Sequence, residues 1–140
     1  MTIATPLLEW YASLTPHTLA QAARYYAADA RFRDPFNDVQ GVAAITAIFR
    51  HMFATTEQPR FVITGCIVQE QQAFATWIFS FRLRGQYYEV EGGSHLQFDA
   101  EGRVTHHRDY WDAAEELLQK LPLVGAPIRW LRRQFRVHTS

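Results

Sequence analysis

An aspartate that directly precedes a proline, Asp34 in Phe32-Arg33-Asp34-Pro35, is the first side chain in this sequence with clear potential for chemistry. Side chains alternate between the two faces of a strand, so Asp34 shares a face with Phe32. Pro35 restrains the residue before it to an extended conformation. We therefore expect a short strand over 29–34 that ends with a carboxyl group on its buried face.

That carboxyl group is compatible with two roles. Burial disfavours the charged form and raises the pKa of a carboxyl group, which makes it a better general base near neutral pH. Alternatively, Asp34 accepts hydrogen bonds from the backbone amides near Phe36 and Asn37 and caps the turn. The sequence leaves both roles open.

Tyr11 is a second candidate because it lies on the apolar side of a predicted helix. Thr5-Pro6 is typical of a helix start, with Thr5 as the capping residue. The apolar stripe has helical spacing and consists of Leu7, Leu8, Tyr11 and Leu14. An inward hydroxyl group facing a base would hydrogen-bond a developing oxyanion. The alternative is a core tyrosine whose hydroxyl group is satisfied within the protein.

The remaining pattern predicts how these groups are held. A second helix is expected from Thr15-Pro16 through Tyr26, and a third from near Gly41. The period then changes, and short polar links separate four predicted strands at 61–70, 73–84, 87–98 and 103–111. The predicted fold class is α+β, a cone-shaped curved antiparallel sheet wrapped around three N-terminal helices.

The hairpin around 99–102 brings further polar groups to the inner face. If those residues form the loop, Phe98 pairs with Arg103, and Ser94 then lies opposite His107. Asp109 falls on the same face, two residues from His107, where its carboxylate would orient the imidazole. Such a histidine is suited to proton transfer. The alternative is a structural pair that closes the sheet.

The last part of the chain is predicted to be helical. Asp112 is a candidate N-cap for a helix over 113–121, and a second helix is expected over 128–137 with arginines on one side. We expect one domain over 1–140 with 113–140 as a helical extension. That extension would either cover the cavity or pack on a second subunit.

The composition argues against several classes of function. The 140 residues carry no formal net charge, which argues against a nucleic-acid partner, and no apolar run is long enough for a membrane span. The one cysteine, Cys66, excludes an internal disulfide and is expected to be buried. The histidine spacing does not predict a metal site, and the absence of a phosphate-binding glycine loop predicts no cofactor. A cytoplasmic location is expected.

The order of these elements over roughly residues 5–112 resembles the nuclear transport factor 2-like superfamily, which includes the SnoaL-like polyketide cyclases and ketosteroid isomerase. In ketosteroid isomerase the general-base aspartate also precedes a proline, which corresponds to Asp34 here. Its oxyanion-binding tyrosine on the first helix corresponds to Tyr11. Its second donor, a protonated aspartate, falls at Ser94, so this chain departs from that pattern. Scytalone dehydratase is loosely similar in its use of histidine and aspartate.

The resemblance implies a domain with an apolar cavity, acting as an isomerase, cyclase or dehydratase by proton transfer on a carbonyl-bearing hydrophobic substrate. The alternative is a non-catalytic ligand-binding or dimerisation module of the same fold. The predicted catalytic residues are Asp34, Tyr11, His107 and Asp109. The predicted substrate-binding residues are Ser94, Phe36, Phe53, Trp77, Phe79 and Trp111. The expected partners are a small apolar molecule and a second copy, bound through outer-face residues including Phe74, Ile78 and Tyr110.

Overall fold

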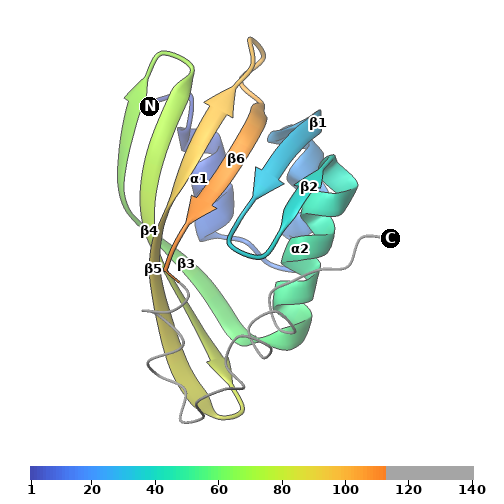
Figure 1. Cartoon of the computed structure of the whole chain (residues 1–140), viewed down its shortest axis with the longest axis vertical. Coiled ribbons are helices and arrows are strands. Elements are labelled where there is room, and N and C mark those ends of the chain that lie inside the picture. Colours follow the sequence, from blue (N-terminus) through green and yellow to red (C-terminus); the bar gives the residue numbers. More distant parts are fainter. Residues whose placement is uncertain (113–140) are drawn as a thin grey trace.

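Six strands form one curved, open sheet in the computed structural model, which describes residues 1–112. The strand order is β2-β1-β6-β5-β4-β3. Figure 1 shows the long strands β3, β4 and β5 bending away from the shorter β1, β2 and β6. Their bounds are β1 Tyr26–Arg33, β2 Asp38–Gln40, β3 Glu57–Gln69, β4 Gln72–Leu83, β5 Gln86–Phe98 and β6 Val104–Tyr110.

Three helical segments accompany the sheet: α1 (Thr5–Ala12), η1 (Thr18–Arg24) and α2 (Val42–Thr55). The first and third agree with prediction, although Ala4 is the N-cap of α1 and the Thr5 hydroxyl accepts a bond from the Thr2 amide instead. The second predicted helix is also present, as the 3-10 helix η1, but it ends at Arg24 and does not extend to Tyr26. The chain leaves it early because Val104 N–H donates to the Tyr25 carbonyl (2.7 Å), which draws Tyr26 into the sheet.

The predicted meander is confirmed for β3 to β6, all of which pair antiparallel. Two features near Asp34 differ from prediction. The turn residues continue into a strand, β2, because Asp34 N–H donates to the Asn37 carbonyl (2.9 Å) and folds the chain back onto β1. In addition, β1 pairs parallel with β6, so the sheet is not wholly antiparallel. This parallel pair places the ends of β1 and β6 side by side.

The predicted register of the last hairpin was wrong by two residues. Ser94 pairs with Asp109, and Leu96 with His107. One residue of the shift comes from the turn, where the Asp99 carboxylate accepts bonds from the Glu101 and Arg103 amides. The other comes from a bulge between the pairs Phe98–Val104 and Gln97–His106. A shift of two preserves which side chains face inward, so His107 is still buried and Asp109 half-buried.

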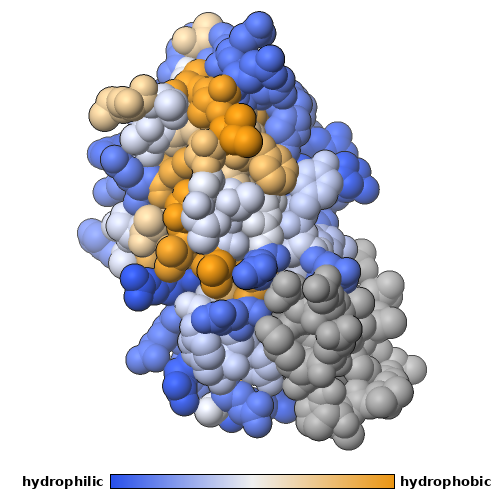
Figure 2. All heavy atoms as spheres, turned by 90° about the vertical axis from the view of Figure 1, so that its left-hand side faces the viewer, coloured by the Kyte–Doolittle hydropathy of each residue, from blue (hydrophilic) through white to orange (hydrophobic). Residues whose placement is uncertain are grey.

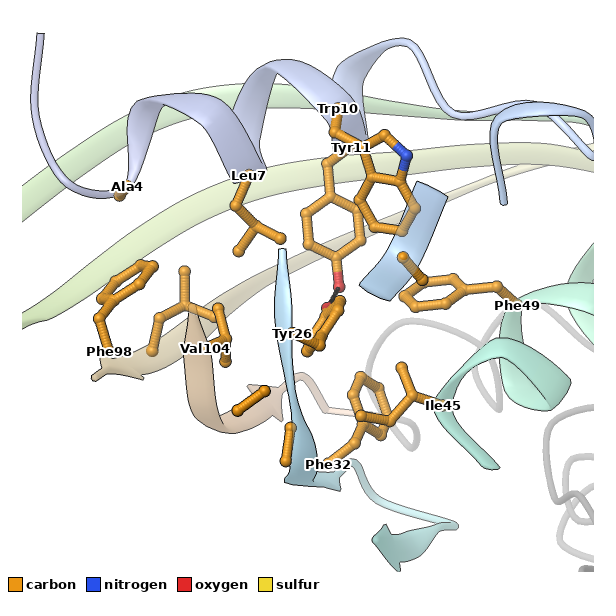
Figure 3. Packing of buried hydrophobic residues seen from close by; sticks show 14 of the residues in the cluster. Ala4, Leu7, Trp10, Tyr11, Tyr26, Phe32, Ile45, Phe49, Phe98 and Val104 are labelled. Atoms are coloured by element: carbon orange, nitrogen blue, oxygen red, sulfur yellow. Dashed lines mark hydrogen bonds between the residues drawn. The ribbon is translucent and has the colours of Figure 1, made fainter. Parts of the chain in front are cut away.

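Apolar side chains from the helices and the sheet make the main core. Figure 3 shows Tyr11 pointing from α1 toward Tyr26, with Phe49 and Ile45 approaching from α2. A second cluster follows the long strands and consists of Trp77, Phe79, Phe81, Tyr88 and Val90, all buried.

In contrast, Cys66 is exposed on the edge strand β3, so the prediction of a buried cysteine was wrong.

Gly92 allows the Trp77 ring to lie against β5. A Cβ atom at position 92 would come within 2.5 Å of Cη2 of that ring. We expect Gly92→Ala to lower the free energy of unfolding by about 1 to 3 kcal/mol, the usual cost of overpacking. Chemical denaturation measures this. Gly65→Ala is the control, because its Cβ would meet only the Thr76 hydroxyl at 3.2 Å; an equal loss for both variants would contradict the prediction.

The expected helices at 113–121 and 128–137 lie outside the described residues. Within residues 1–112, no helix is both long enough and apolar enough to cross a membrane.

Candidate active site

Asp34 immediately follows β1, and its carboxylate caps the turn that Pro35 begins. Its Oδ1 accepts hydrogen bonds from the backbone amides of Phe36 (2.8 Å) and Asn37 (2.7 Å). Within residues 1–112, its Oδ2 has one hydrogen-bond partner, Nδ2 of Asn37 at 3.2 Å. The capping role is therefore real, and it uses mainly one oxygen. The other oxygen retains accepting capacity for a bound molecule.

The environment of Asp34 changes its acidity. The pKa of the Asp34 carboxyl group is raised from 3.8 to about 6, mainly by burial and also by the nearby Asp109 carboxylate, while the hydrogen bonds from Phe36 and Asn37 oppose the rise. Just above that pKa the group is ionised and yet more basic than an ordinary aspartate. This is the property required of a general base at neutral pH.

This shift makes folding stability depend on pH. Between pH 3.8 and about 6 the folded protein keeps the Asp34 proton while the unfolded chain has lost it, so stability falls as pH rises. Below that interval both states are protonated and the loss is absent. Relative to Asp34→Asn, the wild type should lose about 2 to 3 kcal/mol across it. Urea denaturation of both proteins at several pH values measures this; parallel stability curves would contradict it.

Asp34 lines a small apolar cavity, here called the inner cavity. Its volume is about 70 Å³, about half that of an apolar cavity of roughly 150 Å³ that binds one benzene ring. Nine of its wall residues are apolar and three are polar, Asp34, His51 and Asp109. The full wall consists of Phe32, Asp34, Ile48, Phe49, His51, Met52, Phe61, Trp77, Phe79, Val90, Asp109 and Trp111.

An open groove adjoins the inner cavity at the ends of β1 and β6. Its volume is about 730 Å³, and it shares Asp34, Asp109 and Trp111 with the inner cavity. The other residues of this mouth groove are Arg33, Pro35, Arg108, Tyr110 and Asp112. The carboxyl groups of Asp34 and Asp109 therefore lie where the apolar inner cavity meets the wider mouth groove.

Asp109 is held by two donors. Its Oδ1 accepts from the Ser94 hydroxyl (2.5 Å) and faces Nε2 of His107 at 2.6 Å. The Ser94 hydroxyl in turn accepts from the indole N–H of Trp77 (2.9 Å). Because an indole can only donate, the serine proton must point to Asp109. Among residues 1–112, Oδ2 of Asp109 has no hydrogen-bond partner.

Two tyrosines complete this chain behind His107. Its Nδ1 lies 2.8 Å from the Tyr26 hydroxyl and 3.1 Å from that of Tyr11, and the two hydroxyls are 2.8 Å apart. Burial raises the pKa of both tyrosines, so both remain donors. Every polar hydrogen finds an acceptor if Tyr11 donates to Tyr26, Tyr26 donates to Nδ1, and Nε2–H of His107 donates to Asp109. The chain thus converges on Asp109.

The structure separates the predicted site residues into three groups. Asp34, Asp109, Trp77, Phe79 and Trp111 line the inner cavity. Tyr11, His107 and Ser94 do not, since they form the hydrogen-bonded chain behind Asp109. Phe36 packs against Trp111, and Phe53 lines a different surface groove beside Arg60. Tyr11 therefore does not line the inner cavity opposite Asp34, which the predicted pair of base and facing donor required.

Two functional candidates were missed from the sequence. Tyr26 was assigned to a helix because the aromatic and β-branched residues that favour strands are too sparse around it to indicate a strand. His51 lies on α2, and its Nε2 is buried without a hydrogen-bond partner among the described residues. Its position between Ile48 and Met52 on the buried side of the helix was the available signal.

The chain is similar to a known protein family and to several solved structures. The model of the SnoaL-like domain matches residues 7–107. Among solved structures, a protein from Catenulispora acidiphila with a ketosteroid isomerase-like fold, in complex with trimethylamine, has TM-score 0.71 and 20% identity over 86% of this chain and 93% of its own. A search of curated proteins found no match.

Two further solved structures are similar. One, described as a SnoaL-like polyketide cyclase from Jannaschia sp., has TM-score 0.69 and 12% identity over 79% of this chain and 85% of its own. The other, an LEH-like epoxide hydrolase from M. tuberculosis, has TM-score 0.71 and 13% identity over 85% and 88%. At these identities the likeness shows the fold alone. The chain belongs to the SnoaL-like domain family, with a nuclear transport factor 2-like fold.

Metal chemistry receives no support from the part of the chain that the structure describes. Residues 1–112 contain no group of three or more histidine, cysteine or acidic side chains arranged to hold a metal ion.

Proposed function

We propose that this protein is a proton-transfer enzyme, an isomerase, cyclase or dehydratase, for a small hydrophobic molecule that carries a carbonyl group. One observation carries the proposal. Asp34 lines an apolar cavity with a pKa raised to about 6 and with Oδ2 only weakly engaged. A carboxylate that serves solely as a turn cap has no need of a cavity beside its second oxygen.

The proposed step needs no cofactor. Oδ2 of Asp34 removes a proton from the carbon next to the ligand carbonyl. The C–H electron pair forms a C=C bond, and the carbonyl π pair moves onto oxygen to give an enolate. If a C=C bond lies next to the reacting carbon, the enolate extends over it, and return of the proton from Asp34 at its far end gives an isomer. Attack of the enolate on a second carbonyl closes a ring, and the alkoxide formed takes the proton from Asp34. Where a β-hydroxyl group is present, it leaves with that proton as water, which completes a dehydration.

The polar chain behind Asp109 has a positioning role in this proposal. It fixes Oδ1 with two hydrogen bonds and leaves Oδ2 without a hydrogen-bond partner among residues 1–112. Asp109 is then the second acid–base group at the mouth, and His107, Tyr11 and Tyr26 act through it. The aromatic stacking of Phe61, Phe79 and Phe81 favours the alternative, a non-catalytic module whose cone is largely filled.

The test follows deuterium incorporation into small ketones, with cyclohexanone and cyclopentanone as probes in deuterated buffer. Proton abstraction by the protein should exchange the hydrogens beside the carbonyl faster than buffer alone. Thermal shift with the same probes reports binding independently. Binding without exchange would support the non-catalytic module instead.

We also propose a homodimer formed through the outer face of the sheet. Phe74 and Tyr110 are exposed there with ring centroids 6.5 Å apart, and Val62 and Ile67 are exposed on the neighbouring β3. Figure 2 shows an apolar band crossing the side of the molecule where β3 and β4 lie. Exposed apolar area of this kind marks interaction sites.

Analytical ultracentrifugation tests the dimer. The wild type should sediment as a dimer at micromolar concentration, and Phe74→Glu should shift it to monomer because the new charge would be buried in the interface. Gln71→Glu, at the exposed turn after β3, should leave the dimer intact. A monomeric wild type would refute this assembly.

A further inference from the structure

His51 is the polar residue on the helix side of the inner cavity. It lies on α2, whereas Asp34 and Asp109 come from the ends of β1 and β6. Its Nε2 is fully buried and has no hydrogen-bond partner within residues 1–112. A buried nitrogen without a partner is costly, and native structures keep such groups mainly where a ligand or water supplies the missing bond.

The chemistry of the cavity wall defines what that ligand must offer. Asp34 and Asp109 are acceptors when ionised, and the indole N–H of Trp77 is already used by Ser94. A carbonyl oxygen placed near the ionised carboxylates would be repelled. Nε2 of His51 supplies an N–H on the helix side of the cavity. A ligand seated with its carbonyl oxygen toward α2 presents the adjacent carbon toward the sheet.

We propose that His51 donates a hydrogen bond from Nε2 to the carbonyl oxygen of a bound monocyclic ketone and so sets the ligand's orientation. This rests on the proposed function in one respect, that the ligand is a carbonyl compound. It assigns the oxyanion contact to His51 instead of Tyr11, whose hydroxyl is already bonded to Tyr26 and lies near His107. The inner cavity of about 70 Å³ holds only part of a six-membered ring, so the rest of the ring would extend into the adjoining mouth groove.

Two ligands of matched shape isolate the contact. Cyclohexanone and methylenecyclohexane have nearly the same shape, but only the ketone accepts a hydrogen bond. Their affinities are compared by NMR titration for wild type, His51→Leu and His51→Gln, with His106→Leu on the exposed outer face as control. His51→Leu should weaken ketone binding by about 3- to 10-fold, the equivalent of one net hydrogen bond, and should not weaken binding of the hydrocarbon.

Further readouts separate this role from a structural one. His51→Gln keeps a donor and should restore part of the ketone preference. His51→Leu removes an unpartnered buried nitrogen and should fold at least as stably as wild type. Heteronuclear NMR of labelled histidine should show the Nε2 proton shifting with ketone and not with hydrocarbon.

Equal weakening of both ligands by His51→Leu, or an unchanged ketone preference, would overturn the assignment. A preference lost in Tyr11→Phe but retained in His51→Leu would do the same. The outcomes also separate the two proposals. Exchange that depends on Asp34 without a His51 effect refutes this inference alone. A His51-dependent ketone preference without exchange refutes the enzymatic proposal alone. Failure of both probes to bind at millimolar concentration refutes both.

Discussion

Replacement of Asp34 by asparagine is expected to lower the rate of proton exchange in bound ketones by about 10²- to 10⁴-fold, the contribution of a general base. The amide cannot take up the proton, yet its oxygen can still accept from the amides of Phe36 and Asn37, which now bond to Oδ1 at 2.8 and 2.7 Å. The turn should therefore persist. Deuterium exchange at saturating ketone measures the loss.

Asp34→Ala is the companion variant, since it removes both the base and the cap. It should lose exchange to the same degree and should also be about 1 kcal/mol less stable than Asp34→Asn. If Asp34→Asn instead retained exchange, and both variants differed from wild type only in stability, Asp34 would be a turn cap and nothing more.

Replacement of His107 by alanine is expected to cause the largest loss of stability, about 3 to 4 kcal/mol in the free energy of unfolding. The ring is 1% exposed and lies within hydrogen-bonding distance of Tyr26, Tyr11 and Asp109. Its removal leaves a cavity and unpaired buried groups together. Chemical denaturation at neutral pH measures the change.

His106→Ala is the matched control, because His106 is the preceding residue on the same strand but faces solvent. It should change stability by less than about 0.5 kcal/mol. Tyr26→Phe tests one bond of the chain and should cost about 1 to 2 kcal/mol. Comparable losses for His106→Ala and His107→Ala would show that the buried chain adds no stability.

Periodicity was sufficient to predict much of the fold. The alternation of Ala30, Phe32 and Asp34 against Asp29, Arg31 and Arg33 gave the buried and exposed sides of β1 correctly. The helix begun near Gly41 and the four-strand meander followed from the same kind of signal. Local pattern did not reveal β2 or the parallel pairing of β1 with β6, because both depend on bonds between residues that are distant or in a turn.

The site was predictable only in part. Strand parity placed Asp109 and His107 inside because a two-residue register error leaves the faces unchanged. The hydrogen-bond partners of Tyr11 could not be predicted from the sequence. Tyr26 reaches Tyr11 only because η1 ends at Arg24, two residues before Tyr26, and the chain then enters β1. Whether an inward tyrosine faces a ligand or another side chain is a matter of packing, and a single helical stripe cannot distinguish them.

The most direct test of the proposed function compares two titrations in one protein. Carbon NMR of labelled aspartate gives the pKa of the Asp34 carboxyl group, expected near 6. The rate of deuterium exchange into bound cyclohexanone should rise with pH through that same pKa and reach a plateau, because only the ionised carboxylate removes the proton. Exchange that titrates at a different pKa, or no exchange above the buffer rate, would contradict the assignment of Asp34 as the base.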